Sequence, residues 1–223
     1  MFAHRSYVSG IAFAVVFLGA MGAITITTGV LLQVGLGYSP IHASLTMLPF
    51  AVGGTIGSAS GATMVHRVGR TILQAGLALT GAGMVAMVVV LHHAGAGVES
   101  LDLIAPLLVA GIGMGMVWVP LLDVVIADVG DHEVGSASSV LQAVQQLGMS
   151  LGIAAIGTMF FGMVGGGAGR IGDFVDAAQT TTLVTVGLIA AAFAIAFLLP
   201  RRARTQHAPA DGAWSADAEA ALA

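Results

Sequence analysis

A chain of 223 residues that is 57% hydrophobic and 8% charged has too much apolar surface for a soluble fold, in which about a quarter of the residues are charged. The net charge of −4 comes from short local clusters, and no basic surface that could bind nucleic acid is present. The sequence has neither cysteine nor lysine, which excludes disulfides, thiolate metal sites and the lysine-containing phosphate loop of ATP-driven transporters.

Six apolar segments follow one another along the chain, and each is long enough for a membrane-spanning helix of about 20 residues. Glycines are scattered through these segments, as is typical of membrane helices that pack closely. We therefore predict an all-α integral membrane protein with a membrane domain over residues 1–200 and a polar, alanine-rich, disordered tail over residues 201–223. The predicted spans are residues 8–32, 43–65, 71–91, 103–127, 137–164 and 181–199.

The arginines predict the orientation of these spans. With six spans, six of the seven arginines fall on one side of the membrane, and only Arg170 falls on the other. Because cytoplasmic flanks carry an excess of arginine and lysine, we expect a multi-pass protein of the cell membrane with both termini in the cytoplasm. The six arginines are Arg5, Arg67, Arg70, Arg201, Arg202 and Arg204.

Glycine patterns in two of the segments predict close helix packing. Gly53, Gly57 and Gly61 recur every four residues and give the second segment one smooth face, suited to contact with another helix. In the fourth segment, glycines from 111 to 115 are followed by Pro120, which removes a backbone hydrogen bond and allows the helix to bend.

Four stretches of the chain resemble the major facilitator superfamily. The "HRVGR" loop at residues 66–70 is similar to the family motif G-x-x-x-D-R-x-G-R: Arg67, Gly69 and Arg70 match it, but His66 replaces the Asp and Ala62 the first Gly. The other three stretches resemble the carboxyl-terminal half of the 14-helix drug:proton antiporter branch. They are "LQVGLGYSPIHASLTMLP" (32–49), "GIGMGMVWVP" (111–120) and "EVGSASSVLQAVQQLGMSLGIAAIGTMFF" (133–161).

This resemblance implies six transmembrane helices that form one half, or two three-helix repeats, of a major facilitator transporter. Family members export small amphipathic, often cationic drugs in exchange for protons, and their two halves rock around a midplane cavity. The expected partners are the lipid bilayer and, once an amino-terminal half completes the fold, a small-molecule substrate and protons. We expect no enzyme activity, no cofactor and no activity of this chain alone. The alternative is a non-transporting membrane scaffold or a truncated remnant.

The loop motif has two interpretations. In the first interpretation, Arg67 and Arg70 anchor the topology of the second and third spans, and Gly69 allows the turn a positive φ. In the other, which follows from the resemblance, the loop latches neighbouring helices in one access state through its Asp and Arg. His66 cannot supply the fixed negative charge that such a latch requires.

Five polar or aromatic residues within the spans are candidates for a substrate cavity. Asp123 is the one carboxylate clearly inside a span; it is either a proton or substrate site or, about 20 residues into its helix, a residue of the cytoplasmic headgroup region. Gln142, Gln145 and Gln33 face either a cavity or another helix. Trp118 either stacks on a flat ligand or packs at an interface.

Two loop clusters of histidine and carboxylate residues lack strict ligand spacing, so we expect no metal site. They comprise His92, His93, Glu99 and Asp102 in one loop, and Asp128, Asp131, His132 and Glu133 in another.

Overall fold

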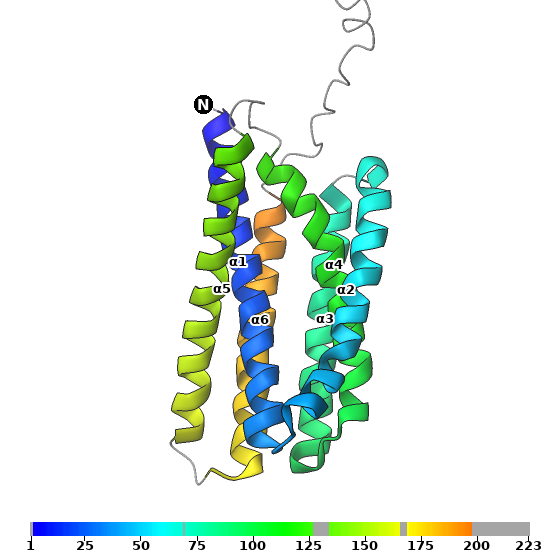
Figure 1. Cartoon of the computed structure of the whole chain (residues 1–223), viewed down its shortest axis with the longest axis vertical. Helices are drawn as coiled ribbons and strands as arrows, with labels where there is room; N and C mark the ends of the chain where they lie inside the picture. The colour runs from blue at the N-terminus through cyan, green and yellow to red at the C-terminus, as the bar shows by residue number, and fades with distance from the viewer. Residues whose placement is uncertain (1, 69, 127–133, 166–168, 198–223) are drawn as a thin grey trace, which may run out of the picture.

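The computed structural model describes residues 2–68, 70–126, 134–165 and 169–197, and helices make up nearly all of this part (Figure 1). No strand occurs in the described residues, so the predicted all-α class is confirmed. A π-helical turn, η1 (Leu31–Gly35), extends α1, and a 3₁₀ turn, η2 (Gly95–Gly97), follows α3. The six α-helices are α1 (Phe2–Val30), α2 (Pro40–Val68), α3 (Arg70–Ala94), α4 (Ser100–Ile126), α5 (Val134–Gly165) and α6 (Ile171–Ala196).

One of these helices overlaps each predicted span. The largest difference is at α6, which begins at Ile171, ten residues before the predicted span at 181. Within the described residues, five helices are long and apolar enough to cross a membrane. The exception is α2, whose apolar residues are interrupted along its whole length by serine, threonine and histidine.

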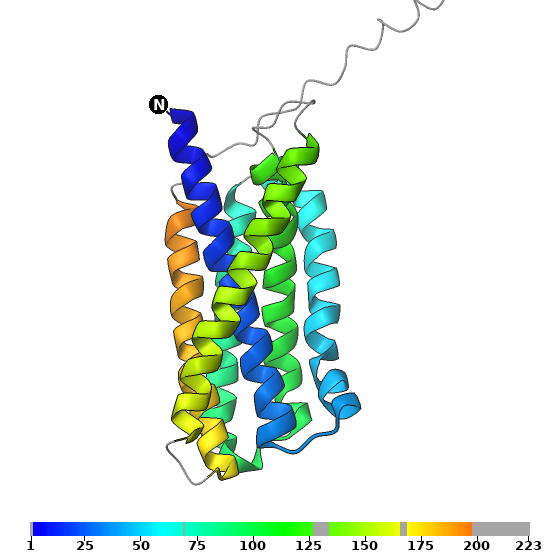
Figure 2. The same cartoon turned by 60° about the vertical axis from the view of Figure 1, so that its left-hand side comes forward.

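The helices pack in two groups of three: α1 with α5 and α6, and α4 with α2 and α3. The main contacts of α1 are with α5 and α6, whereas those of α4 are with α2 and α3; α3 and α6 also contact each other. Exchanging α1–α3 with α4–α6 leaves this set of contacts unchanged, as the prediction of two three-helix repeats requires. Figures 1 and 2 show α2, α3 and α4 gathered on one side of the bundle.

The two ends of the bundle differ in their helix junctions. At one end α2 ends and α3 begins, next to Arg67 and Arg70; we call this the arginine end. The opposite end, which we call the far end, holds η1, η2 and the start of α6 (Figure 1). Gly37, at the far end, has a φ of 67°, which glycine adopts without strain, and Pro40 supplies the preset φ of a first helical residue at α2.

Close glycine contacts hold α4 against α2. An ideal Cβ on Gly57 would lie 2.9 Å from Ile112 C, and one on Gly61 would lie 3.1 Å from Met116 O. Gly53 approaches the backbone of α4 in the same way, so all three glycines predicted to form a contact face do so. The corresponding pair, α1 and α5, has the same type of crossing: a Cβ on Gly22 would lie 2.6 Å from Met149 O.

The buried polar side chains among the described residues are threonines. Most of their hydroxyl groups donate to the carbonyl four residues earlier, as Thr181 does to Ala177 at 2.7 Å, so they need no partner in another helix. Thr27 is different, because its hydroxyl donates to Thr181 Oγ1 at 3.2 Å and thereby joins α1 to α6.

Candidate functional site

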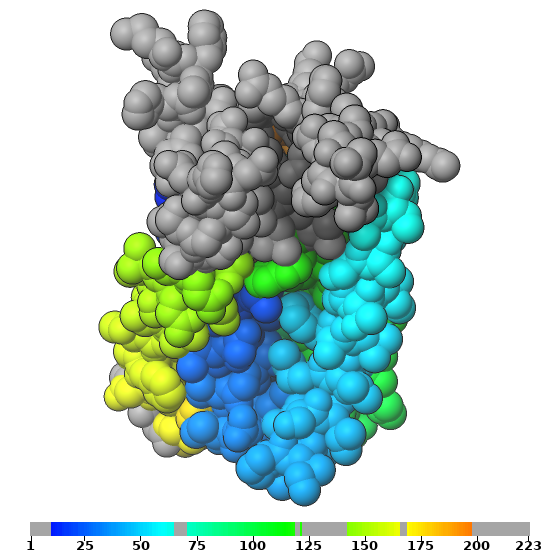
Figure 3. Space-filling view, turned by 45° about the horizontal axis from the view of Figure 1, so that its top comes forward, coloured from blue at the N-terminus to red at the C-terminus, as the bar shows by residue number. Residues whose placement is uncertain are grey.

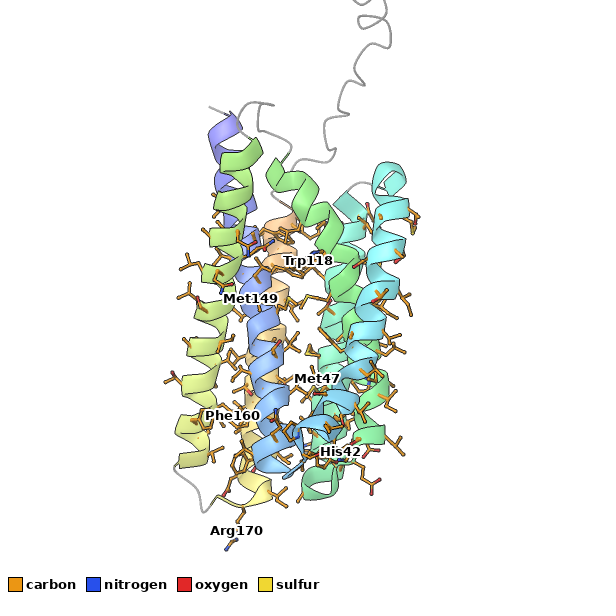
Figure 4. The ribbon with its side chains drawn as sticks, viewed as in Figure 1. His42, Met47, Trp118, Met149, Phe160 and Arg170 are labelled. Atoms are coloured by element: carbon orange, nitrogen blue, oxygen red, sulfur yellow. The ribbon has the colours of Figure 1, made fainter. Side chains whose placement is uncertain are left out.

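A pocket of about 360 Å³ lies between the end of α1 and the start of α2, toward the far end of the bundle. This volume is within the range of small-molecule sites. Figure 4 shows Met47 between the two helices, and Figure 3 shows α1 and α2 side by side on one face of the molecule, next to α5. The lining residues are Thr25, Gly29, Leu32, Gln33, Ala43, Ser44, Met47, Leu48 and Ala51.

Gln33 lies within the π-helical turn η1. Its wider turn is closed by a hydrogen bond from Leu36 N to Leu31 O, five residues earlier, of 2.8 Å. Gln33 follows Gly29 by four residues and Thr25 by eight, so it lies on the side of the helix that carries both.

The polar groups of the pocket differ in their hydrogen bonding. The Thr25 hydroxyl donates to Met21 O at 3.0 Å, and the Ser44 hydroxyl donates to Pro40 O at 2.8 Å. The Gln33 side chain is exposed and has no hydrogen-bond partner within the described part of the chain. Among the polar side chains that line this pocket, the Gln33 amide is therefore the one that can still donate hydrogen bonds to a ligand.

A hydrogen-bonded cluster beside the pocket ties α2 to α4 at the far end. His42 Nε2 lies 3.0 Å from Ser100 Oγ, and Thr46 Oγ1 lies 3.0 Å from the same Ser100 oxygen. The His42 ring also stacks on Tyr38, with ring centroids 4.0 Å apart. His42 therefore bonds across to α4 and not to the pocket (Figure 4).

Gln142 and Gln145 lie on α5 toward the arginine end. The Gly148 Cα lies against Val15 of α1, since an ideal Cβ there would be 3.1 Å from Val15 O. Gln145, about one turn earlier, is therefore level with the turn of α1 before Val15. Gln142 is exposed and Gln145 half-buried, and neither makes a hydrogen bond to another described residue.

The structure does not bring Gln33 together with Gln142 and Gln145. Gln33 follows Val15 by 18 residues, which places it roughly 30 Å from the level of Gln145 at 1.5 Å per residue. Trp118 is half-buried and packs against the hydrophobic core, toward the arginine end (Figure 4). Its role as a surface for ligand stacking stays a prediction.

The loop motif and Asp123 also lie at the arginine end. Arg67 belongs to the last turn of α2, and Arg70 begins α3, so the connection between these helices is very short. Asp123 belongs to the last turn of α4, which ends at Ile126. Gly69 and the side chains of Arg67, Arg70 and Asp123 lie outside the described residues.

Among the described residues, no three histidine or carboxylate side chains come close enough together to hold a metal ion.

A comparison with protein families identifies the architecture. The family description "Major Facilitator Superfamily" matches residues 1–153. The chain belongs to the Major Facilitator Superfamily. Together with the apolar helices, this membership makes it a multi-pass membrane protein of a transporter family.

Several relatives within the Major Facilitator Superfamily are much longer than this chain. The "Probable actinorhodin transporter" of Streptomyces coelicolor is 37% identical over 182 residues, which are 81% of this chain and 32% of the relative. The "Puromycin resistance protein pur8" of Streptomyces alboniger is 30% identical over 88% of this chain and 39% of its own length. The "Multidrug resistance protein Stp" of Mycobacterium tuberculosis is 29% identical over 71% of this chain and 29% of its own length. The chain thus spans about a third of the curated relatives it matches.

The sequence prediction missed the α2 wall of the pocket and the link from His42 to Ser100. A signal for the wall was present, because Ser44, Met47 and Ala51 recur at spacings of three and four residues and therefore share one face of a helix. No comparable signal was present for the link, since its two residues are 58 positions apart.

Proposed function

We propose that this chain forms the carboxyl-terminal, six-helix half of a proton-coupled secondary transporter of the cell membrane that exports small amphipathic molecules, and that it does not transport alone. The resemblance to the 14-helix drug:proton antiporter branch supports the assignment to this half. The names of the relatives refer to an antibiotic transporter, to puromycin resistance and to multidrug resistance, which supports drug export as the activity.

The observation that carries this proposal is that three glutamine amides at the helix surface have no hydrogen-bond partner within the described residues. Gln33 and Gln142 are exposed and Gln145 is half-buried, and none of the three makes a hydrogen bond within the described residues. An amide that lacks a partner inside a membrane costs about 1–2 kcal/mol. We infer that these amides face a second half or a water-filled cavity, and not lipid.

Proton coupling requires a titratable group, and the position of Asp123 makes it a poor candidate for a relay at the middle of the membrane. It belongs to the last turn of α4, at the arginine end. A carboxylate near a membrane surface has a small energetic cost and needs no functional explanation. As the family resemblance implies, the coupling carboxylates are proposed to belong to the amino-terminal half.

The test is efflux from bacterial cells that lack their own drug exporters, with ethidium and Nile red as fluorescent substrates. One strain expresses this chain, and another expresses it fused to the part of the S. coelicolor relative outside the matched segment. We expect efflux from the fused protein alone, abolished by a protonophore and retained in the Asp123→Asn variant. Membrane insertion of both proteins without any efflux would favour the alternative, a non-transporting scaffold. Efflux by the unfused chain would contradict the proposal that it needs a second half.

A further inference from the structure

The walls of the pocket between α1 and α2 carry no charge. None of its nine lining residues is acidic or basic. The first acidic residue of the sequence is Glu99, so neither α1, η1 nor α2 has a carboxylate anywhere. A cation that enters an apolar site loses hydration, and this pocket has no carboxylate to neutralise its charge, so the site favours an uncharged molecule over a cation.

The polar groups of the pocket also differ in whether they can donate a hydrogen bond to a ligand or only accept one. A glutamine amide has two donors and one acceptor oxygen, and those of Gln33 have no partner within the described residues. The hydroxyl protons of Thr25 and Ser44 are already donated to Met21 O and Pro40 O, so these two oxygens offer only lone pairs to a ligand. Apolar side chains such as Leu32, Met47 and Leu48 form most of the remaining wall.

We propose that the pocket between α1 and α2 binds an uncharged amphipathic molecule that carries both a carbonyl oxygen and a hydroxyl or amide donor. The Gln33 amide donates to the carbonyl oxygen, and the Thr25 and Ser44 oxygens accept from the hydroxyl or amide. The apolar part of the molecule contacts Leu32, Met47 and Leu48. This assignment selects the uncharged members of the small amphipathic, often cationic, drugs that the family resemblance implies. It concerns binding only, so it stands independently of the proposed transport activity.

The test uses two photoreactive probes that share one benzophenone group. Benzophenone-4-carboxamide is uncharged and has both donors and carbonyl acceptors, whereas (4-benzoylbenzyl)trimethylammonium is a cation without a donor. The purified whole chain in detergent is illuminated with each probe, and the labelled positions are quantified by mass spectrometry. We expect the carboxamide to label the segments of residues 25–33 and 43–51 in preference to the cation.

Two substitutions of Gln33 distinguish specific binding from adsorption. Gln33→Leu should lower labelling by the carboxamide about fivefold, the effect of one net hydrogen bond. Gln33→Glu should lower it too and should raise labelling by the cation, a gain that misfolding cannot produce. Gln146→Leu, which changes an exposed glutamine on α5 outside the pocket, is the matched control and should leave both probes unaffected. Equal labelling of the two segments by both probes, or unchanged labelling in both Gln33 variants, would overturn the proposal.

Discussion

The crossing of α2 and α4 predicts the cost of adding one methyl group at Gly57. In Gly57→Ala the new Cβ would lie 2.9 Å from Ile112 C and from Met116 N and would overlap Ile112 O. Favourable carbon contacts lie at about 3.5–4.0 Å, so the two helices must separate. The contacted atoms belong to the backbone and cannot rotate away. We therefore expect the free energy of unfolding to fall by about 1–3 kcal/mol, as for other overpacked sites.

Gly187→Ala is the matched control, because an ideal Cβ at this α6 position meets nothing within 4 Å. Both variants gain the same intrinsic helix propensity, so the difference between them isolates the steric effect. The measurement is the unfolding of the purified chain by sodium dodecyl sulfate in mixed micelles, followed by circular dichroism. Gly57→Ala should unfold at a lower detergent fraction than Gly187→Ala. Equal midpoints for the two variants would show that α2 and α4 are not packed backbone to backbone.

Three further predictions concern orientation, the loop motif and the contact between α1 and α6. In this cysteine-free chain, a cysteine at Ser39 should react with an impermeant thiol reagent added outside cells and one at Thr205 should not; the reverse pattern would refute the arginine-based orientation. Arg67→Ala should disturb membrane insertion or efflux of the fused transporter more than His66→Ala, as measured by protease protection and dye efflux, and wild-type insertion and efflux in both variants would leave the loop without a role. Thr27→Val should lower the free energy of unfolding in mixed micelles by about 0.6 kcal/mol, the average for hydrogen bonds between membrane helices, and should have no effect if its bond to α6 is not formed.

The helices and their glycine contacts could be predicted because they depend on local sequence patterns. An apolar run of some twenty residues predicts a span, and the four-residue repeat of Gly53, Gly57 and Gly61 predicts one smooth helix face. The partner of that face could not be predicted, because a repeat on one helix does not specify which other helix approaches it. The structure identifies this partner as α4.

The candidate site was harder to predict, since its residues come together through tertiary structure. Gln33 was found from its polarity within an apolar segment, which needs no knowledge of the fold. The sequence named it, like Gln142 and Gln145, as a candidate that faces a cavity or another helix, and the structure places it near the opposite end of the bundle from those two. The π turn at Leu31–Gly35, which contains Gln33, has no recognised sequence signature.

The central claim is that this chain is one half of a proton-coupled transporter, and transport by purified protein in liposomes tests it most directly. Liposomes with an imposed pH gradient contain either this chain or its fusion to the unmatched part of the S. coelicolor relative, and uptake of ethidium and Nile red is followed by fluorescence. The account predicts gradient-dependent uptake with the fused protein and none with this chain alone. Gradient-dependent uptake by this chain alone, lost in the Asp123→Asn variant, would contradict the account and make Asp123 the coupling residue.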